Sequence, residues 1–463
     1  MVKTRFAPSP TGYIHVGNVR TALYTYLVAR KNKGKFILRI EDTDQSRLVE
    51  GAEELILDTL KWLGLEWDGE IVRQTSRKDI YLDYASKLIE KGLAYADPYS
   101  KEEVEEFREQ AKQAKKAFLY RDYRPENPPF WRLGMPLRFK VPELKRYEWD
   151  DAVMGHLSAG EEALDDFVLI KADGLPTYNF AHIVDDYEMG ITHVIRGAEY
   201  ISSTPKYLSL YKALEIEPPV LAHVPHILAP TGNKKLGKRD GAKSIAEYRN
   251  EGYLPEAVLN FLAQLGWNDG TEQEIFSKNE LIQKFSLDRV QKSGARFDEK
   301  RLVWLNGQWI RSLNLDDLYQ RCKPFWESGD EIYKKKVLAL AQDRLKTLSD
   351  LPALTSYFFE EPEIDMKLIT ENKQLKRLTD NELKHLLRAS ESALDRLDEW
   401  TSKAIQSCLN SLLEELKTKP SVLFSLVRIA TTWAPFSPQL NETLALVGKK
   451  RTLLRLHRLL DSL

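Results

Sequence analysis

A histidine, a glycine and an asparagine stand together where a turn meets a predicted helix near the N-terminus. The segment His15-Val16-Gly17-Asn18 follows a turn that contains two prolines and Gly12. The first N–H groups of a helix and the helix dipole favour an anion, so this junction predicts a phosphate site. His15 could donate a hydrogen bond to phosphoryl oxygens as charge builds up in a transition state. A surface histidine beside a turn is the alternative interpretation.

Three acidic residues follow the next predicted strand, which spans residues 36–40. Glu41, Asp42 and Asp44 would face the ligand crevice, because the carboxyl ends of strands in an open α/β sheet point into it. The carboxylates could hold an ammonium group or a metal ion there. A capped turn that leads into the following helix is the alternative.

Two groups of cations could meet negatively charged ligands. Arg5 lies on the first predicted strand, immediately before the crevice, and its guanidinium fork matches a carboxylate. Residues 234–239 form a cationic loop with Gly237 as a hinge, and such a loop could fold over a polyphosphate. Taken alone, each group has an ordinary alternative: an exposed strand arginine, and a solvated run of charge.

The elements that must position these residues follow an α/β order near the N-terminus. A short strand at residues 4–7, helical spacing of apolar residues from 19 to 29, the strand at 36–40 and a helical face at 50–63 follow in turn. Strand, glycine-containing turn, helix and strand open a parallel-sheet nucleotide-binding unit.

The character of the sequence changes after this opening. Residues 101–116 are highly charged, and residues 120–131 are rich in proline and aromatic side chains, which indicates an insertion. The α/β pattern resumes with predicted strands at 192–196 and 223–228.

Helical periodicity predominates after about residue 249. A helix at 255–265 begins with Pro255, and Thr379 to Glu382 is a capping box that opens another helix. We interpret the basic residues near the C-terminus as a solvated helix face; they are Lys449, Lys450, Arg451, Arg455 and Arg458.

Length and composition restrict the class of protein. A chain of 463 residues is expected to form several domains. Lys and Arg number 68 and Asp and Glu 69, so any positive field for nucleic acid must be local. Two distant cysteines, Cys322 and Cys408, suit a reducing compartment and exclude a Cys-rich zinc site. Without an apolar leader or an apolar run of about 18 residues, we expect a cytoplasmic protein that does not enter a membrane.

Five ordered segments resemble the class I aminoacyl-tRNA synthetases, and specifically the bacterial-type glutamyl-tRNA synthetases. They are FAPSPTGYIHVGN, RIEDTD, PTYNFAHIVDD, HVIRGAEYISSTPKY and KKLGKRDGA. The resemblance runs from residue 3 to about residue 311, and beyond that only length and helical character match. The order and mutual placement of the five segments make the resemblance specific.

The resemblance implies site residues position by position. The ATP-binding positions are His15, Gly17, Asn18, Glu199, Lys235, Leu236, Lys238 and Arg239, with His15 and Lys238 in catalytic roles. The glutamate-binding positions are Arg5, Ala7, Ser9, Glu41, Tyr178, His182 and Arg196. Arg5 would pair with the side-chain carboxylate, Arg196 with the α-carboxylate and Glu41 with the ammonium group. An amino acid with two carboxylates needs two cationic contacts, and the two arginines would supply them.

The implied activity is that of a glutamate–tRNA ligase. L-Glutamate would react with ATP, accompanied by Mg²⁺, to give glutamyl-adenylate, and the terminal adenosine of tRNA(Glu) would then accept the glutamyl group. No zinc is expected, the first step would need bound tRNA, and a monomer would suffice. Asn18 and Gly237 depart from the family pattern, where a histidine and a serine are usual.

The implied fold is α/β plus all-α. A Rossmann-like catalytic domain, residues 1–75 and 172–249, would be split by an acceptor-end-binding insertion at 76–171. A helical stem-contact linking domain at 250–315 and an all-helical anticodon-binding domain at 316–463 would follow.

Several alternatives stay open. A glutaminyl-tRNA synthetase would differ at the first motif and at the carboxylate motif. A shortened paralogue that glutamylates a modified tRNA base would lack the long helical region. A tRNA-binding protein that has lost catalysis would not need Arg5, His15, Glu41, Arg196 and Lys238. A non-discriminating enzyme would also charge tRNA(Gln) with glutamate.

Overall fold

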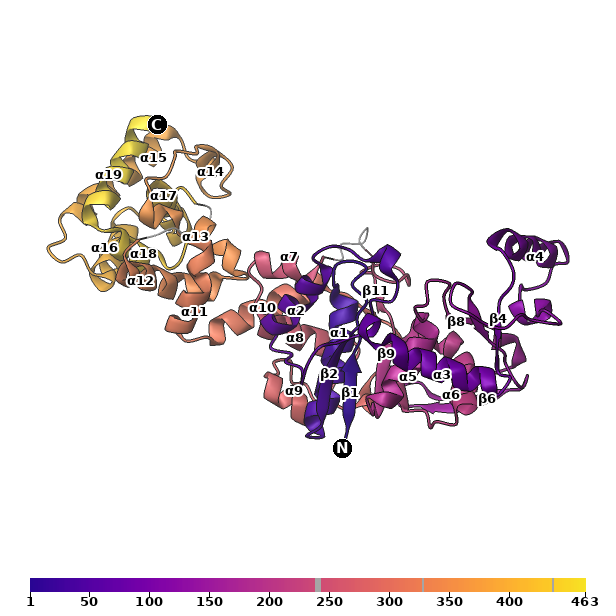
Figure 1. The fold of residues 1–463 in the computed structure, drawn as a ribbon. Helices are drawn as coiled ribbons and strands as arrows, with labels where there is room; N and C mark the ends of the chain where they lie inside the picture. Colours follow the sequence, from indigo (N-terminus) through magenta and orange to yellow (C-terminus); the bar gives the residue numbers. More distant parts are fainter. Residues whose placement is uncertain (238–242, 327–328, 435–436) are drawn as a thin grey trace. The chain divides into compact units, whose positions relative to one another are not determined.

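The computed structural model describes residues 1–237, 243–326, 329–434 and 437–463, and these residues form two compact units (Figure 1). The first unit comprises residues 1–248 with 255–299, and the second comprises residues 249–254 with 300–463. The first unit contains the sheets and the second is built from helices. The domain boundaries expected from the sequence stay a prediction.

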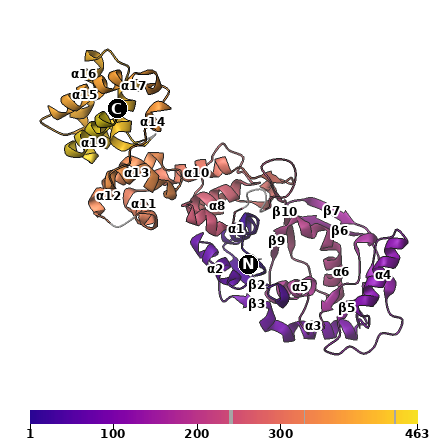
Figure 2. The ribbon, with the colours of Figure 1, turned by 90° about the horizontal axis from the view of Figure 1, so that it is seen from above.

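A seven-stranded sheet organises the first unit, in the order β3-β2-β1-β9-β10-β6-β7. Its strands are β1 (Lys3–Phe6), β2 (Lys35–Ile40), β3 (Val72–Arg73), β6 (Tyr147–Asp151), β7 (Gly155–Ala159), β9 (His193–Gly197) and β10 (Val220–Val224). Neighbouring strands are parallel except for β6 and β7, which form an antiparallel pair. Figure 2 shows β9, β10, β6 and β7 following one another across this sheet. The predicted parallel α/β core is confirmed.

Nine helices accompany the sheet in the described part of this unit. They are α1 (Val16–Lys31), α2 (Ala52–Trp62), α3 (Lys78–Glu90), α4 (Lys101–Gln113), α5 (Tyr178–Glu188), α6 (Thr204–Leu214), α7 (Ile245–Asn250), α8 (Pro255–Gln264) and α9 (Lys278–Lys284). α1 lies against β1 and β2, and the apolar residues that predicted it, from Val19 to Ala29, are buried. Burial of this face fixes the turn before α1 at the carboxyl end of β1.

The segment expected as an insertion contributes strands to two sheets. β4 (Ala94–Ala96), β5 (Leu137–Phe139) and β8 (Val168–Ile170) form a separate antiparallel sheet. β6 and β7 instead extend the main sheet, through the pairing of β6 with β10. Residues 147–159 are therefore part of the sheet that carries the cavity described below.

One predicted strand is broken in two. The sequence predicted a single strand at 223–228, whereas β10 ends at Val224 and a short strand, β11 (Ile227–Leu228), pairs with β12 (Ala295–Arg296). Pro225 separates them, and proline has no N–H to continue a ladder. The break turns the chain away from the sheet at the edge of the cavity.

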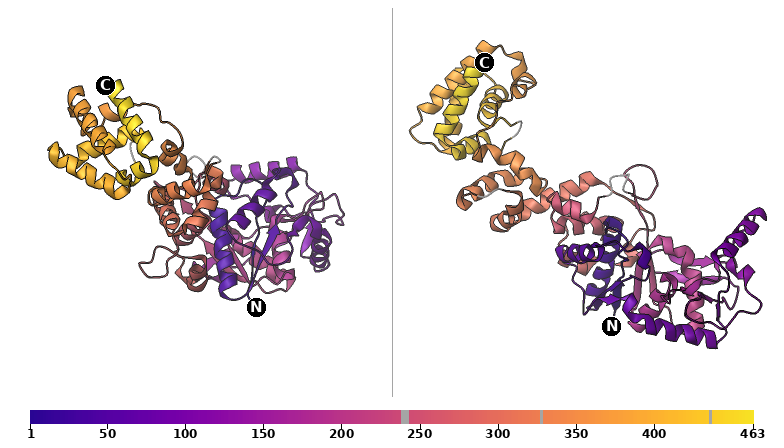
Figure 3. Two further views of the ribbon diagram at one scale, coloured as in Figure 1. Left: turned by 90° about the vertical axis from the view of Figure 1, so that its left-hand side faces the viewer. Right: turned by 45° about the horizontal axis from the view of Figure 1, so that its top comes forward.

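The second unit is helical throughout its described residues, as both views in Figure 3 show in orange and yellow. Its helices are α10 (Glu299–Ser312), α11 (Leu315–Cys322), α12 (Glu331–Ala341), α13 (Leu351–Phe359), α14 (Lys367–Thr370), α15 (Asp380–Asp395), α16 (Ser402–Glu415), α17 (Pro420–Thr432), α18 (Leu440–Val447) and α19 (Lys449–Ser462). The predicted capping box is present, since Thr379 accepts from the Glu382 N–H and the Glu382 carboxylate accepts from the Thr379 N–H. None of the helices in the described ranges has both the length and the apolar character to cross a bilayer.

The interpretation of the basic C-terminal helix as a wholly solvated face is wrong for Arg455. Its side chain is fully buried and donates to the carbonyl oxygens of Tyr357, Glu360 and Thr431. It also pairs with the Glu361 carboxylate at 3.0 Å. A cation that caps the last carbonyls of α13 and meets a carboxylate is stabilised in the interior.

Gly34, in the turn between α1 and β2, gives a test of the packing of that turn against the residue before β1. A Cβ at Gly34 would lie 2.1 Å from the carbonyl oxygen of Val2, so a side chain would displace the start of β1. We expect Gly34→Ala to reduce the free energy of unfolding by about 1–3 kcal/mol, the usual cost of overpacking. Urea unfolding followed by circular dichroism measures the loss. The control is Gly12→Ala, where a Cβ meets nothing within 4 Å; equal effects of the two changes would contradict the prediction.

Candidate active site

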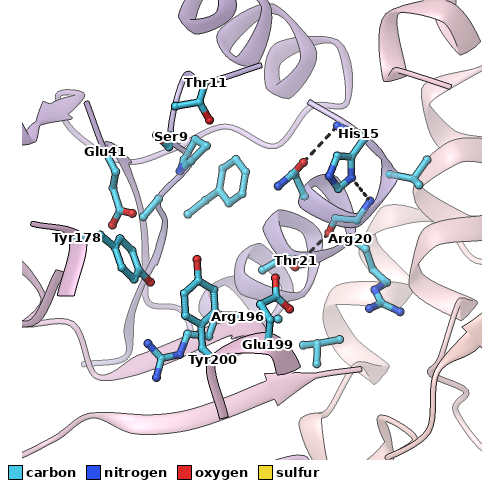
Figure 4. Close-up of a pocket in the computed structure, with 18 of the residues that line it drawn as sticks. Ser9, Thr11, His15, Arg20, Thr21, Glu41, Tyr178, Arg196, Glu199 and Tyr200 are labelled. Carbon is cyan, nitrogen blue, oxygen red and sulfur yellow. Dashed lines mark hydrogen bonds between the residues drawn. The ribbon is translucent and has the colours of Figure 1, made fainter. Parts of the chain in front are cut away.

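A cavity of about 1320 Å³ opens over the carboxyl ends of β1, β2, β9 and β10 in the first unit (Figure 4). The loop after β1, the residues after β2, the start of α5 and the end of β9 line it, together with segments on either side of residues 238–242. This is the edge at which open α/β sheets bind ligands.

Most of the residues expected from the sequence meet in this cavity. Those that line it are Arg5, Ala7, Ser9, His15, Gly17, Asn18, Glu41, Tyr178, Arg196, Glu199, Lys235 and Leu236. His182 does not line the cavity but lies behind Tyr178, with the two rings stacked at 4.6 Å. Lys238 and Arg239 fall outside the described residues.

His15 is the N-cap of α1. Its Nδ1 accepts from the Gly17 N–H at 3.1 Å, and the Asn18 Oδ1 accepts from the His15 N–H at 3.3 Å. Because Nδ1 is an acceptor, the proton of the neutral ring is on Nε2, which is then a donor. Burial, together with the charge of Lys235, lowers the pKa of His15. The ring is therefore a neutral donor at the N-terminus of a helix.

Gly17 lies so close to the His15 ring that the position has little room for a side chain. A Cβ there would be 3.0 Å from the ring Cε1 and 3.1 Å from Nδ1. The glycine therefore lets the ring fold back over the first turn of α1. Asn18, which the sequence suggested as a ligand donor, uses its side-chain oxygen to cap its own helix.

Buried ion pairs form the floor of the cavity beneath Arg5. The Arg5 Nε donates to Asp186 Oδ1 at 3.0 Å and its Nη2 donates to Asp186 Oδ2 at 3.3 Å. Arg39 donates to the same Asp186 at 2.7 Å and to Glu41 at 3.0 Å. Arg5 is 5% exposed and Arg39 fully buried, so the carboxylates supply the partners that water would supply at the surface.

The tandem acids Asp185 and Asp186 on α5 have mostly different partners, although both approach Arg39, with Asp185 Oδ2 at 3.8 Å from the Arg39 Nε. Asp185 accepts from Gln74 at 2.8 Å, from Arg77 at 2.7 Å and from Tyr81 at 2.8 Å, and so ties α5 to the start of α3. The sequence segment VDD contains both acids, but its pattern did not identify them as site residues. Their role follows only from the folded contacts.

Carboxylates in this floor titrate unusually. Burial tends to raise the pKa of Asp186, but Arg5 and Arg39 hold it well below its usual range. Burial raises the pKa of Glu41 in spite of Arg39 and Arg5. Asp186 is therefore the carboxylate that the arginines hold most firmly in its charged form.

Arg196 lies among aromatic rings on another side of the cavity. Its guanidinium carbon is 5.1 Å from the ring centre of Tyr200 and 5.0 Å from that of Tyr207, within cation–π distance. Tyr178 packs against Tyr200, with ring centres 5.4 Å apart, and Figure 4 shows both rings in the cavity. Burial, with the charge of Arg196, lowers the pKa of His182 to about 3, so its ring is neutral. Tyr200 and Tyr207 lie inside the segment HVIRGAEYISSTPKY, but the sequence pattern does not identify them as site residues.

The far side of the cavity contains Glu199, His226 and Lys235. His226 Nδ1 lies 3.6 Å from Glu199 Oε2. The backbone from Lys234 to Leu236 pairs with the β11 region, through Ala229 N–H to Lys234 O at 3.0 Å and Leu236 N–H to Ile227 O at 2.8 Å. The first half of the cationic loop is thus anchored beside His15. Among the described residues no cluster of three or more His, Cys, Asp or Glu side chains could hold a metal ion.

Both parts of the chain match known families. The family described as "tRNA synthetases class I (E and Q), catalytic domain" matches residues 1–304, and "Anticodon binding domain" matches residues 317–460. The chain is 41% identical over 481 residues to the glutamate–tRNA ligase of Clostridium botulinum (strain Okra / Type B1), covering 100% of this chain and 98% of the relative. It is 40% identical over 472 residues to that of Thermodesulfovibrio yellowstonii, with both chains covered completely.

A solved structure is similar over the same length. The crystal structure of a glutamate tRNA ligase from Elizabethkingia meningosepticum, in complex with its amino acid, superposes with a TM-score of 0.87 at 32% identity. The match covers 100% of this chain and 99% of that one. The similarity therefore includes the helical second unit, where the sequence motifs give no correspondence.

Asp186→Asn tests the buried floor. The change leaves Arg5 and Arg39 buried with one carboxylate fewer, so we expect a loss of about 3–5 kcal/mol of stability, as for a broken buried ion pair. Urea unfolding at neutral pH measures the loss. The control Glu143→Gln removes an exposed partner of Lys145 and Lys212 and should leave the unfolding midpoint unchanged.

The ion pairs of Asp186 with Arg5 and Arg39 also predict how the free energy of unfolding depends on pH. The folded pKa of Asp186 is depressed, so its stabilisation is complete above the unfolded value of about 4 and is lost progressively as pH falls from there to the lower folded value. The difference between the wild type and Asp186→Asn should stay constant from neutral pH to about pH 4 and narrow below it. A difference that vanishes nearer neutrality would contradict the ion pair.

Proposed function

The chain belongs to the class I tRNA synthetase family that includes the glutamate–tRNA ligases, and on that premise we propose that it activates L-glutamate with ATP and transfers it to tRNA(Glu). The observation that supports this substrate is the part of the cavity in which two buried arginines, Arg5 and Arg196, accompany one buried carboxylate, Glu41. Two carboxylates and an ammonium group on the ligand complement that set of charges. A third buried arginine of the lining, Arg20, lies on the His15 side and donates to the backbone carbonyl oxygens of Leu265 and Pro225.

In the proposed complex, Arg5 binds the side-chain carboxylate of glutamate and Arg196 binds the α-carboxylate. Glu41 receives the ammonium group, with Ser9 nearby, and the Tyr178 hydroxyl aids Arg5 at the side-chain carboxylate. Ala7 leaves room next to Arg5, and the neutral His182 supports the Tyr178 ring from behind. The protein partners of Arg5 and Arg196 orient both guanidinium groups before the substrate arrives, which reduces the entropic cost of binding.

ATP occupies the other half of the cavity. The helix N-terminus at His15 to Asn18 faces its phosphates, and the His15 Nε2–H donates to phosphoryl oxygens. Lys235, Leu236 and Glu199 lie on this side. Lys238 and Arg239 are expected to complete it.

The reaction follows from positioning and charge stabilisation. An oxygen of the α-carboxylate attacks the α-phosphorus of ATP, and pyrophosphate leaves with its electron pair. A hydroxyl of the terminal adenosine then attacks the carbonyl carbon of the adenylate, and AMP leaves. The side chains hold the reacting groups in line and stabilise developing phosphate charge, and no side chain becomes covalently attached.

Mg²⁺ is expected to enter with ATP. The ion keeps several waters and is held by phosphates and one or two carboxylates, so it needs no cluster of protein ligands. Glu199 faces the ATP half of the cavity and fits that requirement, so it would hold the hydrated ion. When bound, the ion neutralises charge on the phosphate oxygens. We further expect a monomer that works in the cytoplasm.

Labelled-glutamate charging of two purified transcripts tests the proposed function. We expect tRNA(Glu) to be charged in the presence of ATP, and Lys238→Ala to lose charging, which separates an enzyme from a protein that only binds tRNA. Charging of tRNA(Gln) as well would widen the substrate range to a non-discriminating ligase. Folded protein that charges neither transcript would overturn the proposal.

Arg5→Lys tests the placement of the glutamate side chain. Lysine keeps the charge but loses the fork that pairs with Asp186 and a ligand carboxylate together. We expect KM for glutamate to rise about tenfold or more, the effect of losing a hydrogen bond to a charged group, with little change in KM for ATP. Steady-state charging at varied glutamate and varied ATP measures both. Equal increases in the two constants would indicate general damage to the cavity instead.

A further inference from the structure

Arg5 and Arg196, two of the arginines that line the cavity, are anchored in different ways. Arg5 is held by a carboxylate, in its paired contact with Asp186. Arg196 Nε donates instead to the Nε2 of His223 at 3.1 Å, and its Nη2 lies 3.5 Å from the Thr204 Oγ1. Within the described residues, no carboxylate approaches the Arg196 guanidinium to ion-pair distance. Its charge is therefore left available to a ligand.

His223 is in turn held by Asp151. The His223 Nδ1 and the Asp151 Oδ2 are 2.6 Å apart, and both side chains are fully buried. Asp151 also accepts backbone N–H groups from Val153 at 3.0 Å, from Met154 at 2.9 Å and from His223 itself at 3.1 Å. These bonds fix the carboxylate at the end of β6.

The hydrogen bonds determine the tautomer of His223. The ionised Asp151 carboxylate can only accept, so the imidazole proton is on Nδ1. Nε2 then presents a lone pair, which the Arg196 Nε–H needs as its acceptor. Burial lowers the pKa of His223 although Asp151 opposes it, and Arg196 adds to the lowering, which agrees with a neutral ring.

The fold brings these residues together from three neighbouring strands. Asp151 ends β6, His223 lies on β10 and Arg196 lies on β9. His223 is the register partner of Arg196, and Leu221 is that of Asp151. Figure 4 shows Arg196 beside Tyr200, on the side of the cavity that also holds Tyr178 and Glu41. Asp151, His223 and Arg196 thus form a row of hydrogen-bonded side chains that runs from the buried sheet into the cavity.

We propose that Asp151 and His223 are positioning residues that aim the Arg196 guanidinium at the α-carboxylate of the amino acid while leaving its charge unpaired. The inference rests on the proposed function, which gives Arg196 its ligand. A carboxylate in place of His223 would compete with the substrate for the same charge. A protonated imidazole would offer Arg196 a donor and a like charge. Only the neutral Nδ1–H tautomer of His223 orients the Arg196 guanidinium without neutralising its positive charge.

Asp151→Asn is the most informative variant. The amide oxygen can keep the bonds to the Val153 and Met154 N–H groups, while the NH₂ replaces the Oδ2 that faces His223. Nδ1 must then accept, the proton moves to Nε2, and two donors face each other at Arg196. We expect KM for L-glutamate to rise about tenfold, as for one lost hydrogen bond to a charged group. kcat and KM for ATP should change less than twofold.

The tautomer is measured directly by ¹⁵N NMR of protein labelled at histidine. The wild type should show the His223 proton on Nδ1 and Asp151→Asn should show it on Nε2, with the resonance assigned by its loss in His223→Leu. A wild-type proton on Nε2 would overturn the inference without any variant having to fold. A swapped tautomer with an unchanged KM for glutamate would also overturn it.

Further variants separate this inference from the proposed function. Arg196→Lys should raise KM for glutamate by at least as much as Asp151→Asn; if it does not, the assigned role of Arg196 fails. If Arg196→Lys raises KM for glutamate and neither Asp151→Asn nor His223→Leu does, only the positioning role fails.

His223→Gln, whose amide oxygen can accept from Arg196, should recover part of the loss in affinity for glutamate that His223→Leu causes. His193→Gln on β9, the strand of Arg196, is the matched control: its Nδ1 contacts the Thr192 Oγ1 at 2.8 Å, and the change should leave KM unchanged.

Discussion

Keeping arginines charged beneath a cavity is the constraint on which the rest of the first unit depends. A guanidinium removed from water needs carboxylates or other acceptors in fixed positions, or the fold loses several kcal/mol (roughly 3–5) for the pair. Arg5 and Arg39 find them in Asp186 and Glu41, which come from α5 and the end of β2. The separation of β1, β2 and α5 is therefore set by the length of these ion pairs as well as by apolar packing.

The different anchoring of Arg5 and Arg196 has consequences for selectivity. Arg5 shares its charge with Asp186, so a neutral amide in place of the ligand carboxylate would leave the guanidinium partly compensated by the protein. Among the described residues, Arg196 contacts a neutral imidazole, the Thr204 hydroxyl and two aromatic rings but no carboxylate, so an anionic ligand would matter more to it. Charge placement of this kind discriminates between ligands of similar shape, because an unmatched buried charge costs more than an ill-fitting apolar group.

The sequence predicted what is local and missed what depends on distant strands. The loop after β1, Glu41 and Asp44 after β2, and the start of α1 follow from turn residues, strand ends and caps, and the structure places these residues in one cavity. The prediction is wrong for Asp42, whose carboxylate instead accepts from the Thr75 N–H and hydroxyl. Asp151 and His223 could not be selected, because they are 72 residues apart and only the pairing of β6 with β10 joins them. The prediction for Arg455 is wrong for a related reason. Helical periodicity indicates a charged face but not the distant carbonyl groups against which the Arg455 side chain is buried. The roles of the cavity residues in binding and catalysis stay predictions.

The pairing of β6 with β10 also bears on modularity. The segment expected to bind the acceptor end of the tRNA looks, in the linear sequence, like a cassette that could be exchanged between relatives. Its strand β6 nevertheless ends in the carboxylate that holds His223, two strands away from Arg196. A chimera cut at residues 76 and 171 would exchange Asp151, and with it the proposed positioning of Arg196, along with the segment expected to bind the acceptor end. The proposed positioning role therefore couples the two segments through one row of hydrogen bonds across three strands.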